Sequence, residues 1–418
     1  MRRFVLVLVM AVFCAPLRAE VAWETSFDKA LGAARASGRP VLADFTAPWC
    51  YSCYYMETNV LRGSVFAGVA KGFVLARVDV DRPEGRALKE KYRVRFLPSF
   101  VVVDAAGKET GRVMGEQKEA DFVRQLQSFA GPAKASAEDE AVAKLRALLN
   151  SDELSAASAV AAKEPAKLPA LGARADWRTL KLRLSLKLHP AFEDLAAMVD
   201  VNDGCDLAYD LETALDAKLQ GPLSTLLPRL EPWAQRRVWA PPAERCADFR
   251  SGVEVLASYY EAAGDAAAKT ATLDRAVAQA ASESDKAGVG QNRNLDDNRR
   301  FFLETAGKDK DLEAFYPRLI GAYPSDYVYA FRFAKWLEKK DRPADALAWI
   351  EKADKLCYGA NRLSVTKVHA QILDSLKRRP EASALLRREI KAYRKALPEE
   401  TKQLEELLAS WPDPRRKS

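Results

Sequence analysis

A run of strand-forming residues leads into two closely spaced cysteines, and this junction constrains the fold more than any other feature of the chain. Residues 41–46, Val-Leu-Ala-Asp-Phe-Thr, favour a buried central strand. Cys50 and Cys53 follow after Ala-Pro-Trp, and residues 54–61 then have the apolar spacing of a helix. Cys50 is therefore predicted at the first turn of a helix, where free N–H groups and the helix dipole stabilise a thiolate.

The residues around this junction resemble the thioredoxin family. Asp44 occupies the place of the buried carboxylate that assists the second cysteine, and Trp49 that of the tryptophan before the first. Pro98 stands where the family carries a cis-proline, and Gly115 follows in the expected order. Four separated elements in the right order make the resemblance specific.

The resemblance covers residues 20–131 and implies an α/β thioredoxin fold, a central mixed sheet flanked by helices. The expected strands and helices after the cysteines are 73–81, 84–94, 96–104, 112–115 and 118–130. Within the superfamily, the pattern is similar to the C-terminal domain of the transmembrane thiol:disulfide interchange reductase. The shared features are an extra helical segment at 64–72 and Leu97 before the proline.

Thiol–disulfide exchange without a cofactor is the chemistry that this resemblance implies. Cys50 and Cys53 form the redox-active disulfide: Cys50 attacks a partner disulfide and Cys53 resolves the mixed disulfide. Asp44 is the third catalytic residue, accepting or relaying the Cys53 proton. The substrate-binding residues implied are Trp49, Tyr51, Leu97 and Pro98. The expected partners are disulfide-containing or dithiol proteins, including an electron donor or acceptor.

The residues between and after the cysteines bear on the direction of exchange. Tyr51-Ser52 carries no positive charge, and Tyr54 stands where thioredoxin has lysine. This favours a reductase of moderate potential, roughly between −270 and −180 mV, with an oxidase or isomerase as the alternative. Tyr51, Tyr54 and Tyr55 either form an aromatic rim for partner peptides or pack into the fold.

The cysteine pair has two other interpretations, a zinc site and a structural disulfide. A zinc site is disfavoured, because no second Cys or His pair stands at ligand spacing, so no metal is expected. A structural disulfide on an inactive thioredoxin fold is also disfavoured, because Asp44 and Pro98 are both retained.

Histidine and net charge exclude several other functions. The chain of 418 residues has two histidines, His189 and His369, which disfavours Ser-His-Asp and Cys-His catalysis. The formal charge of +7 includes three arginines of the N-terminal segment, and the remainder is dispersed. Nucleic acid is therefore not expected as a partner.

Residues 1–19 have the layout of a secretory signal peptide. Two arginines precede an apolar run, residues 4–15, that is too short to span a bilayer, and cleavage is expected after Ala19. Bulky Phe13 before Cys14 disfavours lipid attachment. We expect an exported protein without stable membrane insertion, periplasmic if the source is a Gram-negative bacterium.

Beyond a small-residue linker at 132–140, the sequence becomes helical throughout. We divide it into a helical domain, 141–285, and a region with a weak repeat, 286–418. Turns between paired helices are expected at Gly264, Gly307, Lys340 and Arg378, with spacings of 43, 33 and 38 residues. This spacing brackets that of tetratricopeptide repeats, about 34 residues, and an irregular helical bundle is the alternative.

Three cysteines lie in this helical part. Cys205 and Cys246 are candidates for a structural disulfide, and Cys357 is then left over as a buried, inert thiol. Stacked helical hairpins bind peptides or proteins on their concave side. The rival to an enzyme is therefore an adaptor or holdase in which the thioredoxin domain is structural. The oligomeric state is left open.

Overall fold

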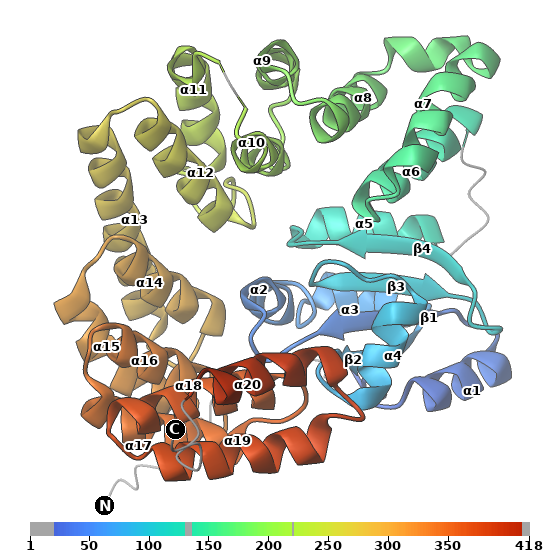
Figure 1. Cartoon of the computed structure of the whole chain (residues 1–418). Coiled ribbons are helices and arrows are strands. Elements are labelled where there is room, and N and C mark those ends of the chain that lie inside the picture. Colours follow the sequence, from blue (N-terminus) through green and yellow to red (C-terminus); the bar gives the residue numbers. More distant parts are fainter. Residues whose placement is uncertain (1–20, 130–135, 220, 412–418) are drawn as a thin grey trace, which may run out of the picture.

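The computed structural model describes residues 21–129, 136–219 and 221–411. The expected signal peptide and residues 132–135 of the expected linker lie outside these ranges. Within them, a mixed α/β domain is followed by a long succession of helices, which confirms the predicted fold class (Figure 1). No helix in the described ranges is both long and apolar enough to cross a membrane.

The sheet of the first domain has the order β2-β1-β3-β4. Its strands are β1 (Val41–Thr46), β2 (Val74–Asp79), β3 (Ser99–Val103) and β4 (Glu109–Met114). The central strand β1 pairs in parallel with β2 and antiparallel with β3, and β3 pairs antiparallel with β4. The end of β1 therefore lies in the middle of the sheet, where helix α2 begins.

Side chains alternate between the two faces of β1. Val41, Ala43 and Phe45 pack with helix α1, whereas Leu42 packs with α2, α3 and α5. The helices of this domain are α1 (Phe27–Ser37), α2 (Tyr51–Asn59), α3 (Ser64–Ala70), α4 (Pro83–Lys91) and α5 (Glu119–Phe129). The expected helices 64–72 and 84–94 are thus present as α3 and α4, and the last strand begins earlier than the expected 112–115.

The helical part of the chain runs from α6 to α20. Its elements are α6 (Ala137–Asn150), α7 (Leu154–Lys167), the 3-10 helix η1 (Pro169–Ala173), α8 (Ala175–Leu188), α9 (Phe192–Val201), α10 (Leu207–Asp216), the 3-10 helix η2 (Leu223–Leu226), α11 (Leu227–Arg237), α12 (Phe249–Ala262), α13 (Ala266–Ala287), α14 (Arg293–Thr305), α15 (Asp309–Ala322), α16 (Val328–Lys339), α17 (Pro343–Leu356), α18 (Asn361–Ser375), α19 (Arg379–Tyr393) and α20 (Pro398–Ser410).

Helix α6 begins inside the range expected for the linker. Ser136 accepts a hydrogen bond from the backbone N–H of Asp139, whose carboxylate accepts one from the N–H of Ser136. This reciprocal pairing satisfies two N–H groups that otherwise lack partners and starts the helix at Ala137.

The four turns expected from the weak repeat each separate two helices. Gly264 lies between α12 and α13, and Gly307 between α14 and α15. Lys340 and Arg378 lie between the next two pairs, α16/α17 and α18/α19. The sequence pattern therefore located these helical hairpins correctly.

The helices form an arc around the first domain (Figure 1). At its start, Arg93 pairs with Glu153 at 2.8 Å, and at its end, Arg86 of α4 pairs with Glu400 of α20 at 2.7 Å. Both ends of the helical part therefore contact the α/β domain, and helix α14 lies against α2 between them.

Candidate functional site

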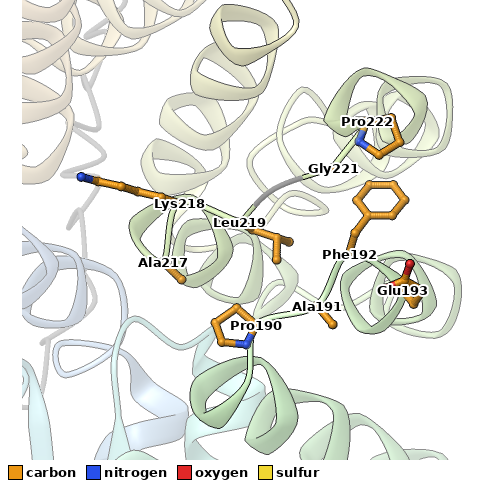
Figure 2. A pocket seen from close by; sticks show the side chains of 9 residues that line it. All are labelled: Pro190, Ala191, Phe192, Glu193, Ala217, Lys218, Leu219, Gly221 and Pro222. Carbon is orange, nitrogen blue, oxygen red and sulfur yellow. The ribbon is translucent and has the colours of Figure 1, made fainter.

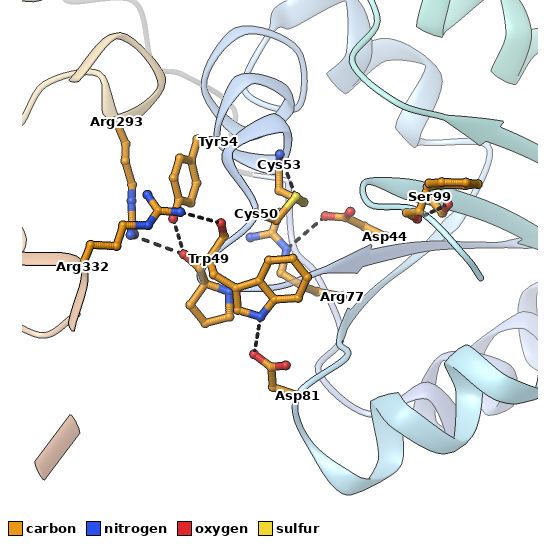
Figure 3. The surroundings of a disulfide bond; sticks show 12 residues. Asp44, Trp49, Cys50, Cys53, Tyr54, Arg77, Asp81, Ser99, Arg293 and Arg332 are labelled. Carbon is orange, nitrogen blue, oxygen red and sulfur yellow. Dashed lines mark hydrogen bonds and ion pairs between the residues drawn. A yellow bond between two sulfur atoms is a disulfide. The ribbon is translucent and has the colours of Figure 1, made fainter. Parts of the chain in front are cut away.

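Cys50 and Cys53 form a disulfide at the start of α2 (Figure 3). Cys50 is the N-cap of this helix, and its Sγ accepts a 3.1 Å hydrogen bond from the N–H of Cys53. The two residues are 5% and 7% exposed. Because N–H groups of the first turn point toward Cys50, the helix end favours negative charge on that sulfur after reduction.

Asp44 is buried on β1, near the disulfide (Figure 3). Burial raises the pKa of this carboxyl to about 6, and the neighbouring Arg77 opposes the shift. Nε of Arg77 lies 3.4 Å from Oδ2 of Asp44, because the two residues are paired across β1 and β2. A carboxyl with this pKa can take up or release a proton near neutral pH. Sequence analysis missed Arg77, although its place in the second strand was a signal.

The Leu97–Pro98 peptide bond is cis, and Pro98 is buried at the start of β3. Its carbonyl accepts a 2.9 Å hydrogen bond from the N–H of Gly115, which has a φ of 74°. Leu97 is half-buried and packs against the apolar cluster that contains Cys50 and Cys53. Leu97 and the two cysteines therefore share the same apolar cluster.

Trp49 is 39% exposed at the edge of the site. Its Nε1 donates a 2.9 Å hydrogen bond to Oδ2 of Asp81 (Figure 3). The same oxygen accepts a 2.7 Å bond from Nδ2 of Asn361 on α18. Burial, together with the nearby carboxylate of Asp79, raises the pKa of Asp81 to about 6. Asp81 thus joins the tryptophan of the motif to the helical part of the chain.

The three tyrosines of α2 have different surroundings. Tyr54 is buried, and its hydroxyl donates a hydrogen bond to the carbonyl of Pro48, so it packs into the fold. Tyr51 is half-buried beneath the guanidinium of Arg250, 3.9 Å from the ring centre. Tyr55 is half-buried against the apolar cluster of α2, α3 and α5.

Arginines of the helical part also reach the residues just before Cys50 (Figure 3). Nη2 of Arg293 lies 3.4 Å from the carbonyl oxygen of Pro48, and Nη2 of Arg332 lies 3.3 Å from that of Trp49. Sequence analysis missed both, and nothing local in the sequence marks them, because they lie more than 240 positions away.

Glu116 is a further residue that sequence analysis missed. It follows Gly115 and lies near Ser52, inside the cysteine motif, and near Asp248 of the helical part. Burial and the charge of Asp248 raise the pKa of Glu116 well above its ordinary value, while Ser52 and Arg250 oppose the shift. Glu116 thus lies between the cysteine motif and the helical part of the chain.

The other cysteines lie in the helical part. Cys205 and Cys246 form a disulfide that joins the segment before α10 to the segment before α12. Cys357 is a buried free thiol, and burial raises its pKa to about 12. At this pKa the thiol carries almost no thiolate near neutral pH and is a poor nucleophile.

A pocket of about 480 Å³ opens in the helical part (Figure 2). It lies between the turn from α8 to α9 and the segment after α10. Among its lining residues are Phe192 and Leu219, with Glu193 and Lys218 as the charged groups. Its lining contains no cysteine, so it offers no thiol chemistry.

Potential metal ligands and the histidine of α18 are the other candidates for reactive groups. Across residues 21–129, 136–219 and 221–411, no group of three or more His, Cys, Asp or Glu side chains could hold a metal ion. His369 lies on α18, and burial lowers its pKa below the ordinary value.

A mixed four-stranded sheet with a disulfide at the start of α2 and a cis-proline before β3 defines a thioredoxin-like domain. The family model described as a thioredoxin-like domain matches residues 27–130. The chain is 35% identical over 114 residues to the thioredoxin H-type of Oryza sativa subsp. indica, covering 27% of this chain and 85% of that relative. The chain belongs to the thioredoxin family.

Two further relatives carry disulfide-related names. The thiol:disulfide interchange protein DsbD of Ralstonia nicotianae is 34% identical over 111 residues, which is 26% of this chain and 18% of DsbD. The disulfide bond reductase DsbH of Chlamydia pneumoniae is 32% identical over 107 residues, 23% of this chain and 63% of DsbH. The chain therefore spans less than a fifth of that DsbD.

Proposed function

We propose that this protein reduces or exchanges disulfides of partner proteins through the Cys50/Cys53 dithiol. The observation that carries the proposal is the position of this pair at the N-terminus of α2, with Leu97, the residue before cis-Pro98, packed against the apolar cluster that contains both cysteines. The pair can form a disulfide, and the helix end favours a thiolate on Cys50 in the reduced state.

The reaction proceeds in two displacements. The Cys50 thiolate attacks one sulfur of the partner disulfide, and the other partner sulfur leaves as a thiolate. Cys53, deprotonated with Asp44 as proton acceptor, then attacks Cys50 and releases the second partner sulfur. The partner gains two electrons, the protein is left with the Cys50–Cys53 disulfide, and an external dithiol protein must reduce it again.

Partner peptides are proposed to bind across the exposed rim of this site. Trp49 and Phe96 are 39% and 47% exposed, and Leu97 lies between Phe96 and the buried Pro98. The backbone of Leu97 can pair with an extended peptide opposite Cys50. Tyr51, which is half-buried, completes this set of substrate-binding residues.

The proposal also covers export of the protein and the direction of thiol–disulfide exchange. The N-terminal sequence, residues 1–19, has the layout of a signal peptide, so we propose an exported protein, periplasmic if the source is a Gram-negative bacterium. The names of the DsbD and DsbH relatives support a reductase or interchange protein over an oxidase or isomerase.

The helical part is proposed to bind protein partners. The proposed division is a thioredoxin-like domain, 20–131, a linker, 132–140, a helical domain, 141–285, and a tetratricopeptide-like region, 286–418. Helix α6, which begins at Ala137, shortens this linker. The hairpins with turns at Gly307, Lys340 and Arg378 support the repeat-like region, whereas the second helix of the Gly264 hairpin, α13, runs across the 285/286 boundary.

Two cysteine variants test the enzymatic proposal. Cys50→Ser should abolish reduction of a protein disulfide such as that of insulin, while Cys53→Ala should accumulate mixed disulfides with partners. Cys357→Ala, which removes a thiol outside the site, should behave as the unmodified protein. Full disulfide reduction by Cys50→Ser would contradict the proposal.

An adaptor or holdase is the second candidate. It is favoured by the low exposure of Cys50 and Cys53 and by the contacts of Arg293 and Arg332 with the segment before them. Complete cellular function of Cys50→Ser would support this candidate and exclude the redox proposal.

A further inference from the structure

Three arginines of the helical part lie beside the start of α2, and a fourth, Arg300, is linked to two of them through Asp297. Arg250 lies on α12, Arg293 and Arg300 on α14, and Arg332 on α16. Their side chains are between 4% and 25% exposed, so they are largely withdrawn from water. Charges in such surroundings act over longer distances than charges on an open surface.

Two of these arginines contact the backbone that leads into Cys50. Arg332 bonds to the carbonyl oxygen of Trp49, the residue before Cys50, and Arg293 to that of Pro48. The guanidinium of Arg293 also stacks 4.1 Å from the ring centre of Tyr54. Figure 3 shows both arginines directed from the helical part toward this segment. Their positive charges are therefore held at the backbone of the two residues that precede Cys50.

Buried carboxylates balance only part of this charge. Asp297 is fully buried and bonds to Arg332 at 2.6 Å, Arg300 at 2.9 Å and Arg250 at 3.3 Å. Although burial alone would raise the pKa of Asp297, these three guanidinium groups hold it well below its ordinary value. Asp326 pairs with Arg293. Asp297 thus faces three of the arginines, and the partly buried Asp326 faces the fourth.

Other carboxyls also lie near the motif. Asp248, near Tyr51 and Glu116, accepts hydrogen bonds from the backbone N–H and the hydroxyl of Ser251 at the start of α12. Glu254 and Glu304, which pair with Arg250 and Arg300, are 43% and 42% exposed, so water screens them. Burial and the charge of Asp248 raise the pKa of Glu116, while Ser52 and Arg250 oppose the shift. Asp44 is paired with Arg77, and Asp81 accepts hydrogen bonds from Trp49 and Asn361.

We propose that Arg293 and Arg332 are positioning residues of the redox site, which stabilise the Cys50 thiolate and make the dithiol form more favourable. This inference rests on the proposed function. It also supplies the cation that the motif lacks, since Tyr51-Ser52 and Tyr54 carry none. The helical part is then a component of the redox centre as well as a surface for partners.

The electron balance gives the direction of the effect. Two glutathione molecules reduce the Cys50–Cys53 disulfide, giving the dithiol and one glutathione disulfide. Ionisation of the dithiol leaves Cys50 as the thiolate and Cys53 protonated. A nearby cation stabilises the reduced product only, so it shifts the equilibrium toward the dithiol and makes the pair a stronger oxidant.

The test uses the full chain with Arg332→Gln and Arg293→Gln, and Arg299→Gln as the matched control. Arg299 lies on the same helix, α14, but its partners are Asp285 and the ring of Phe315. Two quantities are measured for each variant: the equilibrium constant for reduction of the Cys50–Cys53 disulfide by glutathione, and the pH dependence of Cys50 alkylation. We expect each test variant to lower the constant about threefold to tenfold and to raise the Cys50 pKa accordingly, with Arg299→Gln unchanged.

A charge-preserving variant separates electrostatics from docking. Arg332→Lys keeps the cation but loses the planar fork, and it should stay within about twofold of the unmodified protein. Values equal to the control in Arg332→Gln and Arg293→Gln, or equal losses in Arg332→Lys and Arg332→Gln, would overturn the proposal. These equilibria involve glutathione alone, so they are measured whether or not the protein reduces partner proteins.

Discussion

The indole Nε1 of Trp49 lies 2.9 Å from Oδ2 of Asp81, and this hydrogen bond links the cysteine motif to the far end of the helical arc. The same carboxylate oxygen accepts a bond from Asn361, and the neighbouring Asp79 accepts one from the hydroxyl of Tyr358, both at 2.7 Å. The segment at the start of α18 is therefore tied to the loop after β2 and, through it, to Trp49.

Asn361→Ala should loosen this connection. It removes a hydrogen bond to a carboxylate, a contact worth about 1.5–3 kcal/mol, and it leaves Asp81 with one side-chain donor fewer. We expect faster amide hydrogen exchange in residues 358–365 and in the loop after β2. Asn59→Ala, which removes an exposed bond within α2, is the control. Unchanged exchange in both segments would contradict this role of Asn361.

Asp44→Asn should stabilise the oxidised protein at alkaline pH. The pKa of Asp44 is raised from 3.8 to about 6 on folding, so the folded state binds its proton more tightly than the unfolded state. The free energy of unfolding therefore falls as pH rises from about 4 to 6, in total by about 3 kcal/mol, and stays lower above that range.

Asp44→Asn cannot lose stability in this way. Its free energy of unfolding should therefore exceed that of the unmodified protein at pH 8 and equal it at pH 4. Denaturant unfolding at both pH values measures it, and a pH-independent difference would contradict the assignment. If Asp44 relays the Cys53 proton, the variant should also resolve mixed disulfides more slowly.

The local sequence was sufficient to predict the centre of the candidate site. Cys50, Cys53 and Asp44 lie within ten positions of one another, on a strand and the helix that follows it, and this geometry is set by the local chain. Pro98 could be placed because the thioredoxin resemblance supplies its partner strand. The strand-forming run of residues 41–46 and the helical spacing after Cys53 also indicate a strand followed by a helix.

The residues that surround this centre could not be predicted, for a physical reason. Arg293 and Arg332 reach Pro48 and Trp49 from 245 and 283 positions away, through the packing of an arc of helices. Helical periodicity shows which side of each helix is apolar, but not against which distant segment a polar side chain will lie. The positive charge missing from the motif was therefore present in the sequence, yet it could not be assigned to the site.

Removing the Cys205–Cys246 disulfide should destabilise the helical part and leave the redox chemistry intact. The bond closes a loop with a sequence separation of 41, for which the chain-entropy model gives about 3–4 kcal/mol. The double variant Cys205→Ala/Cys246→Ala should lose stability of that order in denaturant unfolding, with Cys357→Ala as control. Its glutathione equilibrium at Cys50 should match the unmodified protein, and a large change there would show that the two disulfides are coupled.

Gly359 and Gly307 form a matched pair for testing how the arc docks on the first domain. Both have left-handed backbones, with φ of 60° and 64°, so alanine strains each by a similar amount, about 1–2 kcal/mol. A Cβ at Gly307 would have no neighbour within 4 Å, whereas one at Gly359 would overlap the carbonyl oxygen of Asp81. Only the second change should therefore push α18 away from the loop after β2.

Gly359→Ala should consequently cost more stability than Gly307→Ala, because the hydrogen bonds of Asn361 and Tyr358 to that loop are lost with the contact. We expect a larger fall in the free energy of unfolding and, in native-state hydrogen exchange, faster exchange around Asp81 for Gly359→Ala alone. Equal costs and equal exchange for the two variants would mean that α18 does not need this close approach to dock, and that the link from Asn361 to Trp49 is secondary.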